Sequence, residues 1–441
     1  MEENKKKNPV LAVLGSIGRA YINSPLILRI AIGLVLGAAL ALLAPKATFI
    51  AVLGTVFVGA LKAIAPILVF ILIISALSTA GRGVGPRFAK VVGFYMASTL
   101  IASMFATAMS FVFKLTIPFA NSPDGYLPPE DLGTVFKTLL SNMVENPVSA
   151  LAGGNYIGIL TWAIVIGLAI RVIASDKTKE LLSDLSSAIS RVVGWVIQLA
   201  PFGIIGLVFD SVSTLGMSIF KDYGLLLLLL VGCMLTVSLV INPTIIAIAL
   251  RRNPYPLVFR CLKESGIQAF FTRSSAANIP VNMKLCRDLG LDKEYYSVSI
   301  PLGATINMDG AAITISVMSL AAAFSLGIDV NIFIAMLMSL VATLGACGAS
   351  GVPGGSLLLI PMACSLLGVD GATAMQVVGV GFMIGVIQDS VETALNSSGD
   401  VMFAATAEFI DWKKQGRPIY FTEKEKARAL AAAEKSDTTE E

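Results

Sequence analysis

Long apolar runs separated by a few polar clusters make up most of this chain. An α-helix rises 1.5 Å per residue, so roughly 20 apolar residues cross the ~30 Å hydrocarbon core of a bilayer. Runs of this kind predict membrane-spanning helices at residues 25–44, 48–79, 88–118, 156–173, 179–216 and 223–250. We expect Pro201-Phe202-Gly203 to break the fifth of these, and the Pro- and Gly-punctuated stretch 120–155 to form an extracellular elaboration.

The last part of the chain has a different pattern. Two pairs of apolar runs are each too short to cross the bilayer: residues 257–271 with 281–290, and 331–345 with 356–368. Tips of polar or small residues, Thr272–Pro280 and Ala346–Gly355, join the members of each pair, which predicts two re-entrant helical hairpins. A full-length span with a polar interruption follows each hairpin, at Gly303–Ala312 and Gln388–Asp400. Such paired interruptions are typical of the inverted repeats that form a transporter's binding site.

Composition indicates a polytopic membrane protein. Of the 441 residues, 56% are hydrophobic and only 14% are charged, against about 25% charged in soluble domains. We therefore expect an all-α integral membrane protein with about eight transmembrane helices plus the two hairpins. A net charge of +3 is too small to indicate a nucleic-acid partner.

The residue types exclude several kinds of active site. The chain contains no histidine, which excludes Ser-His-Asp and Cys-His catalysis as well as histidine-ligated metals. Its five cysteines are odd in number and lie mostly in or beside apolar runs, which favours small core residues over disulfides or zinc ligands. An intramembrane hydrolase using Ser274 or Ser275 would need a base, and Arg273 does not lose its proton in proteins. We expect no enzymatic activity.

Basic residues set the expected orientation. They cluster before the first span, between the second and third spans, at Arg251-Arg252, and in the tail from Lys413 onward, whereas the opposite loops are poor in lysine and arginine. By the positive-inside rule we expect both termini to be cytoplasmic. The N-terminal residues lack a cleavage-like site, so we expect no removable signal peptide.

The most informative polar cluster lies within the last span. On a helix, Asp389, Glu392, Thr393, Asn396 and Asp400 fall on one continuous face. Carboxylates at membrane depth each cost several kcal/mol unless something pairs with them, so the pattern indicates a cation and a charged ligand. The alternative, a helix face in water, would need polar flanks, but the flanking residues are apolar.

A second cluster points to the kind of cation. Asp309 and Asp400 each follow an asparagine, Asn307 and Asn396, in apolar surroundings. Oxygen ligands of this type, together with carbonyls freed where a helix unwinds, suit a hard cation such as sodium. Calcium is disfavoured because no single loop gathers several carboxylates. The alternative for Asp309 is a structural role as a helix-breaking residue bonded to the backbone.

The first hairpin tip and the last span together indicate an amino-acid ligand. The free N–H groups of a hairpin helix, with the Ser275 hydroxyl, suit a carboxylate, and Asp389 suits an ammonium group. We expect Glu392 to face the ligand's side chain and to repel a second carboxylate, since like charges ~4 Å apart cost about 4 kcal/mol at an effective dielectric of 20. A small hydroxylated side chain fits, with Glu392 or Thr393 accepting its hydrogen bond. Alternatively, Arg273 and Glu392 neutralise each other.

Four motifs, in this order, resemble those of the dicarboxylate/amino acid:cation symporter (glutamate-transporter-like) family. They are Thr272-Arg273-Ser274-Ser275, Gly303-Ala304-Thr305-Ile306-Asn307-Met308-Asp309-Gly310, Gly351-Val352-Pro353-Gly354-Gly355, and the cluster from Asp389 to Asp400. The similarity runs from the first span to about Glu408. More narrowly, Phe270–Met283 and Gln388–Ser398 resemble the bacterial sodium-coupled serine/threonine carriers of this family. This resemblance implies a multi-pass protein of the bacterial inner (plasma) membrane.

The resemblance implies a glutamate-transporter-like homotrimer with an elevator mechanism, in which a transport domain slides against a scaffold. The implied division is a cytoplasmic N-terminus at 1–24, scaffold helices at 25–85, a transport-domain helix at 86–119, the elaboration and further scaffold helices at 120–216, the transport domain at 217–412 and a cytoplasmic tail at 413–441. Within 217–412 the implied order is a helix, the hairpin 257–290, the helix 294–324, the hairpin 329–369 and the helix 371–412.

The resemblance also implies the residues of three sodium sites and one substrate site. The sodium ligands would be Gly303, Asn307, Asn396 and Asp400 at one site, Thr305, Ala346, Cys347 and Ala349 at a second, and Tyr95, Ser98, Thr99, Asn307 and Asp309 at a third. The substrate contacts would be Arg273, Ser274, Ser275, Val352, Asp389, Glu392, Thr393 and Asn396.

Departures from the family pattern refine the expected substrate. Family members with acidic substrates are expected to carry arginine where Glu392 stands and threonine where Ala311 stands, so both differences remove recognition of a side-chain carboxylate. The sequence thus predicts a secondary active transporter that imports serine and threonine by sodium symport. The alternatives are a sodium-coupled carrier of another small neutral or acidic amino acid, and a passive channel, which two hairpins closing a midplane site disfavour.

Overall fold

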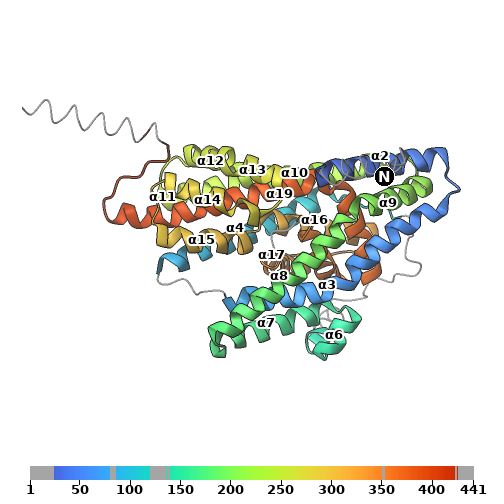
Figure 1. The fold of residues 1–441 in the computed structure, drawn as a ribbon, viewed down its shortest axis with the longest axis horizontal. Coiled ribbons are helices and arrows are strands. Elements are labelled where there is room, and N and C mark those ends of the chain that lie inside the picture. The colour runs from blue at the N-terminus through green and yellow to red at the C-terminus, as the bar shows by residue number, and fades with distance from the viewer. Residues whose placement is uncertain are drawn as a thin grey trace, which may run out of the picture.

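The computed structural model describes residues 24–79, 86–119, 137, 140–349, 353–422 and 425, and the elements found there are all helices (Figure 1). The first half contains α2 (Leu26–Leu43), η1 (Thr48–Ile50), α3 (Ala51–Thr79), α4 (Pro86–Phe113), α6 (Pro147–Gly153), α7 (Tyr156–Ile173), α8 (Asp176–Gln198) and α9 (Ala200–Leu215). The second half contains α10 (Ile219–Thr236), η2 (Val237–Ile241), α11 (Asn242–Leu250), α12 (Tyr255–Cys261), η3 (Leu262–Gly266), α13 (Ile267–Thr272), α14 (Ser275–Asp288), α15 (Lys293–Ile306), α16 (Asp309–Ser325), α17 (Ile332–Ala346), η4 (Ser356–Leu359), α18 (Ile360–Leu366) and α19 (Gly371–Lys414).

The helices have the lengths of a multi-span membrane protein. Six helical stretches in the described part are long and apolar enough to cross a bilayer: Thr48–Ser78, Arg87–Phe113, Tyr156–Ile173, Ile219–Leu250, Lys293–Ser325 and Gly371–Lys414. The pair α8 and α9, bent by 53°, adds a seventh if it counts as one span, and α2 is a shorter apolar helix. The bend comes at Leu199, just ahead of the predicted break, because Pro201 is favoured in the first turn of a new helix. The all-helical, multi-span class predicted from the sequence is confirmed.

The first hairpin has a tighter tip than the sequence suggested. α12, η3 and α13 form its first arm, the chain turns at Arg273 and Ser274, and α14 returns as the second arm. Arg273 adopts a left-handed conformation with φ 52°. The Ser274 hydroxyl accepts the N–H of Ala277 at 3.2 Å and caps α14, so the predicted tip residues Ser275–Pro280 are helical.

The second hairpin and the two spans that follow the hairpins differ in backbone. α17 forms its first arm and η4 with α18 the second, while residues 350–352 of its tip lie outside the described part. The helix breaks between α15 and α16, where Asn307 and Met308 leave helical geometry. The polar stretch of α19 is unbroken, and the hydroxyls of Ser390, Thr393 and Ser398 are satisfied within the helix, since each donates to the carbonyl four residues earlier at 2.7–2.8 Å.

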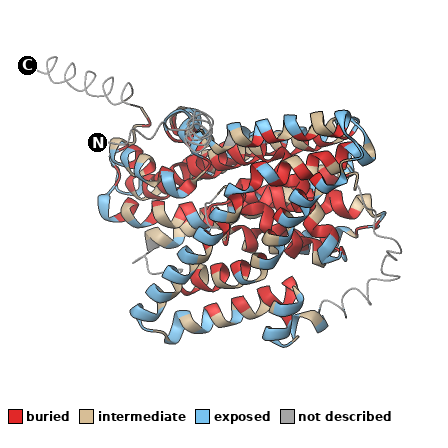
Figure 2. Ribbon diagram, turned by 45° about the vertical axis from the view of Figure 1, so that its right-hand side comes forward, coloured by how far each residue is buried: buried red, intermediate tan, exposed pale blue. Residues whose placement is uncertain are grey.

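The helices pack in two groups, and the polar centre lies in the second. α2, α3, α7, α8 and α9 contact one another, whereas α16 packs against α4, α17, α18 and α19. In Figure 1, α2 and α9 lie at one end of the molecule and α11, α12, α14 and α15 at the other. Figure 2 shows buried residues filling the interior and exposed residues along the outer helices. Contacts of α19 with α3 and α9 join the two groups.

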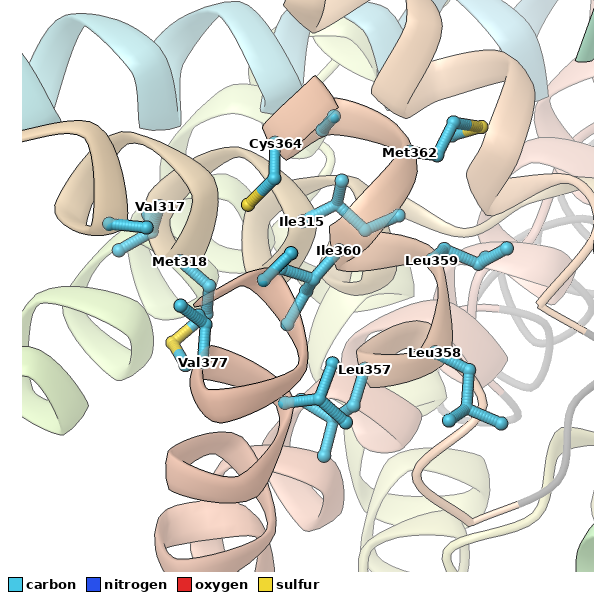
Figure 3. Packing of buried hydrophobic residues seen from close by; sticks show 14 of the residues in the cluster. Ile315, Val317, Met318, Leu357, Leu358, Leu359, Ile360, Met362, Cys364 and Val377 are labelled. Carbon is cyan, nitrogen blue, oxygen red and sulfur yellow. The ribbon is translucent and has the colours of Figure 1, made fainter. Parts of the chain in front are cut away.

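Apolar packing fixes the second hairpin against its neighbours. Side chains from η4 and α18, including Leu357 and Ile360, converge on Ile315 and Met318 of α16 and on Val377 of α19 (Figure 3). All of these side chains are less than 2% exposed. In lipid no hydrophobic driving force acts between helices, so close van der Waals packing of these side chains holds the arms of the hairpin behind its tip.

Candidate functional site

The break between α15 and α16 brings polar side chains of several elements together inside the protein. Asn307, Asp309 and Asp400 are fully buried, and Asn396 is 3% exposed. The backbones of α16 and α19 approach closely here, since a Cβ on Gly310 would lie 2.8 Å from the Cα of Glu392. Only glycine permits that approach without a shift of one helix.

The first polar set surrounds Asp309. The Ser98 and Thr99 hydroxyls of α4 donate to its Oδ1 at 2.9 and 3.0 Å, and the Asn242 amide of α11 donates to Oδ2 at 2.8 Å. The Ser98 hydroxyl also lies 3.4 Å from the side-chain amide oxygen Oδ1 of Asn307. Two hydroxyls, an amide oxygen and a carboxylate thus gather at one point, which is an all-oxygen set that suits a hard cation. Of the residues predicted for this site, these four are brought together.

The second polar set surrounds Asp400. The Asn307 amide donates to Asp400 Oδ1 at 3.0 Å and to the Asn396 carbonyl at 2.9 Å. The Tyr95 hydroxyl donates to the Asp400 carbonyl at 3.0 Å. Gly303 also lies here, since a Cβ on it would be 2.9 Å from Asp400 Oδ1. The structure therefore gathers the predicted ligands Gly303, Asn307, Asn396 and Asp400, and it places the Tyr95 hydroxyl beside Asp400, although the residue is predicted for the other site.

The predicted residues of the remaining sodium site are less tightly gathered. Thr305 at the end of α15 and Cys347 at the tip of the second hairpin line the same 640 Å³ cleft, which opens toward α3 and α8. The Thr305 hydroxyl donates to the Leu302 carbonyl at 2.7 Å, and the Ala346 carbonyl accepts the Ala349 N–H at 2.9 Å. These oxygens are bonded within their own segments.

The buried arginine pairs with a different acid from the one considered in the sequence analysis. Arg273 Nε donates to Asp389 Oδ2 at 2.7 Å, and the other Asp389 oxygen accepts the Gly354 N–H of the second hairpin at 3.2 Å. The alternative in which Arg273 and Glu392 neutralise each other is wrong. The left-handed turn at Arg273 brings its side chain to α19 nearly one turn before Glu392. Asp389 thus joins the tips of both hairpins.

Glu392, less than one helical turn after Asp389 on α19, is held by neutral hydrogen-bond donors. Its Oε2 accepts hydrogen bonds from the hydroxyls of Thr314 and Ser356 at 2.7 and 3.0 Å and from the Gln388 amide at 2.5 Å. The Glu392 side chain is 5% exposed. Its carboxylate therefore contacts α16 and η4 and makes no ion pair among the described residues.

The remaining predicted substrate residues lie around the first hairpin tip. Ser275 is 3% exposed at the start of α14, where the first backbone N–H groups of a helix have no partner within it. The Thr393 hydroxyl donates to the Asp389 carbonyl at 2.7 Å, and Asn396 Oδ1 accepts the Gly310 N–H at 2.7 Å. Val352 lies outside the described residues.

The site carries an excess of negative charge. Asp309, Asp389, Glu392 and Asp400 are all at most 5% exposed, and Arg273 is the only basic residue among the buried side chains that the structure describes. With every group ionised, four negative charges and one positive charge leave a net charge of −3. Among the described residues no three Cys, Asp or Glu side chains cluster as a metal-binding group. The arrangement fits single carboxylates completed by hydroxyls and carbonyls.

Several site residues were not singled out from the sequence. Asn242, Asn282, Thr314, Ser356 and Gln388 all hydrogen-bond a buried carboxylate. Asn242 had a visible signal, because it is the one amide side chain in the Leu-rich span 223–250 and a proline follows it. The proline that follows it lacks an N–H, and the wide turn η2 accommodates it by a bond from the Asn242 N–H to the Val237 carbonyl.

Comparison with known proteins places the chain among sodium-coupled carriers. The model of the sodium:dicarboxylate symporter family matches residues 26–409. A Bifidobacterium adolescentis protein named serine/threonine transporter SstT is 56% identical over 411 residues, covering 92% of this chain and 96% of that protein. Proteins of the same name from Streptococcus agalactiae and Streptococcus thermophilus are 56% and 55% identical, covering 88% and 90% of this chain and 97% and 98% of their own lengths.

Proposed function

The chain belongs to the sodium:dicarboxylate symporter family, and we propose that it imports serine and threonine by sodium symport across the membrane. The observation that carries the proposal is the buried charge of the site, in which four carboxylates share one arginine. Charges at membrane depth are costly unless they are paired, so this site needs cations. Sodium ions and the ammonium group of an amino acid supply them.

We assign the sodium ions to the two compact oxygen sets. At Asp309, sodium is coordinated by the carboxylate, by the Ser98 and Thr99 hydroxyls and by the Asn307 amide oxygen. The two hydroxyls then turn their lone pairs toward the ion. At Asp400, it takes the carboxylate with the carbonyls of Gly303 and Asn396. Unwound backbone and half-helix ends that coordinate sodium are common in secondary transporters, and the helix break at Asn307 and Met308 lies beside both oxygen sets. Thr305 with Ala346, Cys347 and Ala349 remains the proposed third set.

We assign the substrate to the space between the hairpin tips and α19. The N-terminus of α14, with the hydroxyls of Ser274 and Ser275, suits the α-carboxylate. Asp389 accepts the ammonium group through the lone pairs that Arg273 and Gly354 leave free, while Thr393 and Asn396 contact the rest of the substrate.

Charge selects a neutral side chain. An acidic substrate needs a cation for its second carboxylate, and Arg273 is already paired with Asp389 at 2.7 Å. Glu392 adds a like charge, which disfavours an acidic substrate further. A carrier of acidic amino acids is therefore the weaker of the two functions. A hydroxylated side chain can donate to Glu392, whose position is set by Thr314, Ser356 and Gln388.

We propose that transport moves one helix group against the other. The group of α4 and α10–α19 holds the assigned site residues, while α2, α3, α7, α8 and α9 contact it through α19, α18, η4 and α10. A site enclosed in one group can change sides of the membrane only if that group moves. We expect the second group to be the transport domain of an elevator, the first to be the scaffold of a homotrimer, and both termini to be cytoplasmic.

Uptake into proteoliposomes tests the function. We expect radiolabelled serine to accumulate under an inward sodium gradient and to stay at background under an equal potassium gradient, with excess threonine competing and aspartate not competing. Serine binding of equal strength in sodium-free potassium buffer would refute sodium coupling. Strong competition by aspartate would favour the acidic-substrate carrier.

A carboxylate-to-amide change tests the ion assignment. Asp400→Asn removes one buried charge while keeping its shape, and a charge-assisted bond is worth about 1.5–3 kcal/mol, so the sodium concentration for half-maximal serine binding should rise about tenfold or more. Glu408→Gln is the matched control, because Glu408 is also buried in α19 but contacts Trp412 and the Asp292 N–H outside the site. A normal sodium titration for the Asp400 variant would remove this residue from the ion site.

A further inference from the structure

A short segment after α19 closes one end of the molecule. The chain turns at Gly416, and residues 415–422, which we call the C-terminal strap, run back toward α11 and α12. Phe421 is fully buried, and its ring packs against Phe409 with centroids 5.7 Å apart. Its carbonyl accepts a hydrogen bond from Arg260 at 3.1 Å. Arg252 donates to the Ile419 carbonyl at 2.7 Å, so the strap is fixed at several points.

A cavity of about 260 Å³ lies between this strap, α12, the end of α14 and the end of α19. It shares no lining residue with the substrate or sodium residues assigned above. Three arginines line it, Arg260, Arg287 and Arg417, each from a different segment, together with one carboxylate, Asp288. The lining charge is therefore +2, and it is still positive when Glu264, which pairs with Arg260 at 3.1 Å, is included.

Two of these arginines are available to a ligand. Arg417 makes no ion pair among the described residues, and its guanidinium lies 3.7 Å above the centre of the Trp412 ring. Among the residues that the structure describes, Arg287 forms an ion pair only with the neighbouring Asp288, at 3.5 Å, and its side chain is 66% exposed. A surface pair of this length contributes little, so an incoming anion gains both guanidiniums at small cost.

The lining chemistry selects a phosphate group. Guanidinium forks match the oxygens of phosphate bidentately, and convergence of several arginines on one small volume is typical of phosphate recognition. A volume of 260 Å³ fits a phosphate diester with a small polar group but lies below the usual range for larger ligands. Basic pockets between helices on the cytoplasmic side of membrane proteins bind phospholipid headgroups, and Tyr420, which lines this cavity, is of a residue type enriched at the membrane interface.

We propose that this cavity is a binding site for a phosphate-bearing anion, with the headgroup of an anionic phospholipid as the source that its position favours. The bound phosphate bridges Arg287 of α14 and Arg417 of the strap, and it thereby joins the first hairpin to the end of α19. The proposal is independent of the transported substrate.

Thermal unfolding of the full-length purified protein tests the site. Added phosphatidylglycerol should raise the melting temperature by about 3 °C relative to phosphatidylcholine at saturation, as expected for a chain of this size at roughly 100 times the dissociation constant. Inorganic phosphate, compared with chloride at equal ionic strength, forms the second arm. The double variant Arg287→Gln/Arg417→Gln should lose the shift. The double variant Lys284→Gln/Lys414→Gln removes the same charge from the same two regions outside the cavity and should keep the shift.

Each outcome decides the assignment. If phosphatidylglycerol alone raises the melting temperature and the arginine variant loses this effect, the ligand is a lipid headgroup. If inorganic phosphate raises the melting temperature as well and the same variant loses the effect, the ligand is a soluble phosphate. Equal shifts with both lipids and none with phosphate, or a shift that persists in the arginine variant, would overturn the site. If the double variant folds poorly, Arg287→Gln alone serves, since that side chain is largely exposed, and native mass spectrometry should find at least half of the retained phosphatidylglycerol lost.

Discussion

The pair between Arg273 and Asp389 gives the sharpest test of the site geometry. Both side chains are buried, at 7% and 4% exposure, and their atoms are 2.7 Å apart. Removing one partner of such a pair leaves a buried charge without compensation, which costs about 3–5 kcal/mol. Arg273→Gln leaves Asp389 with one hydrogen bond from the Gly354 N–H, and Asp389→Asn leaves Arg273 without an acid.

The double variant is the informative measurement. In Arg273→Gln/Asp389→Asn neither charge remains, and the two amides can bond each other, so most of the cost disappears. At roughly 2.1 cal/mol/K of unfolding entropy per residue, a chain of 441 residues loses about 1 °C in melting temperature for each kcal/mol. Each single variant should therefore melt about 3–5 °C below the parent, and the double variant within about 2 °C of it.

The assay is thermal unfolding in detergent, with serine binding by calorimetry on the same samples. Additive losses in the double variant would refute the pair as a contributor to stability. Binding provides a separate result: Asp389→Asn should abolish serine binding even where the double variant restores stability, because the ammonium group loses its acid. Retained serine binding in Asp389→Asn would show that the ammonium group binds at another residue.

Three further predictions follow from single contacts. Glu392→Arg should lower serine affinity at least tenfold and give measurable aspartate binding in a competition assay, and unchanged serine affinity without aspartate binding would contradict the placement of Glu392 beside the substrate. Asn242→Ala removes the donor of Asp309 Oδ2, worth about 1–3 kcal/mol, and should weaken sodium-dependent binding in a sodium titration, whereas exposed Asn253→Ala should not. Asp370 caps α19; burial raises its pKa, but hydrogen bonds from Thr373 and the Ala372 N–H outweigh this and hold the pKa below the ordinary value. Asp370→Ala should lower the free energy of unfolding by about 1 kcal/mol near neutral pH. In urea titrations this difference between variant and parent should disappear as the pH falls through the pKa of Asp370 in the folded protein.

The fold was predictable because hydrophobic run length is a direct consequence of bilayer thickness. The spans, both hairpins and the polar face of α19 follow from apolar periodicity and from the positions of a few polar residues. The capping of α14 by Ser274 was harder to foresee, because a serine before a proline-containing stretch fits either a loop or a helix start. The division into scaffold and transport domain stays a prediction.

The partners within the site were only partly predictable. The sequence placed Asp309 and Asp400 beside asparagines, and the structure adds Asn242 and Asn282 from distant segments that no local spacing relates to them. Arg273 paired with Asp389 rather than Glu392, since a single left-handed residue at a turn decides which helix turn a long side chain reaches. Such choices depend on tertiary geometry, which periodicity does not contain.

The continuity of α19 limits how the site can change shape. This helix runs for 44 residues, about 66 Å, without a proline, and it carries Asp389 and Asp400 on the same rod. An unbroken helix keeps its residues at constant spacing. The distance between Asp389, the proposed ammonium acceptor, and Asp400, the proposed sodium ligand, is therefore the same whichever side of the membrane the site faces. In the proposed transport cycle, access to the site therefore changes through movement of the hairpins and of the break between α15 and α16, while the length of α19 stays constant.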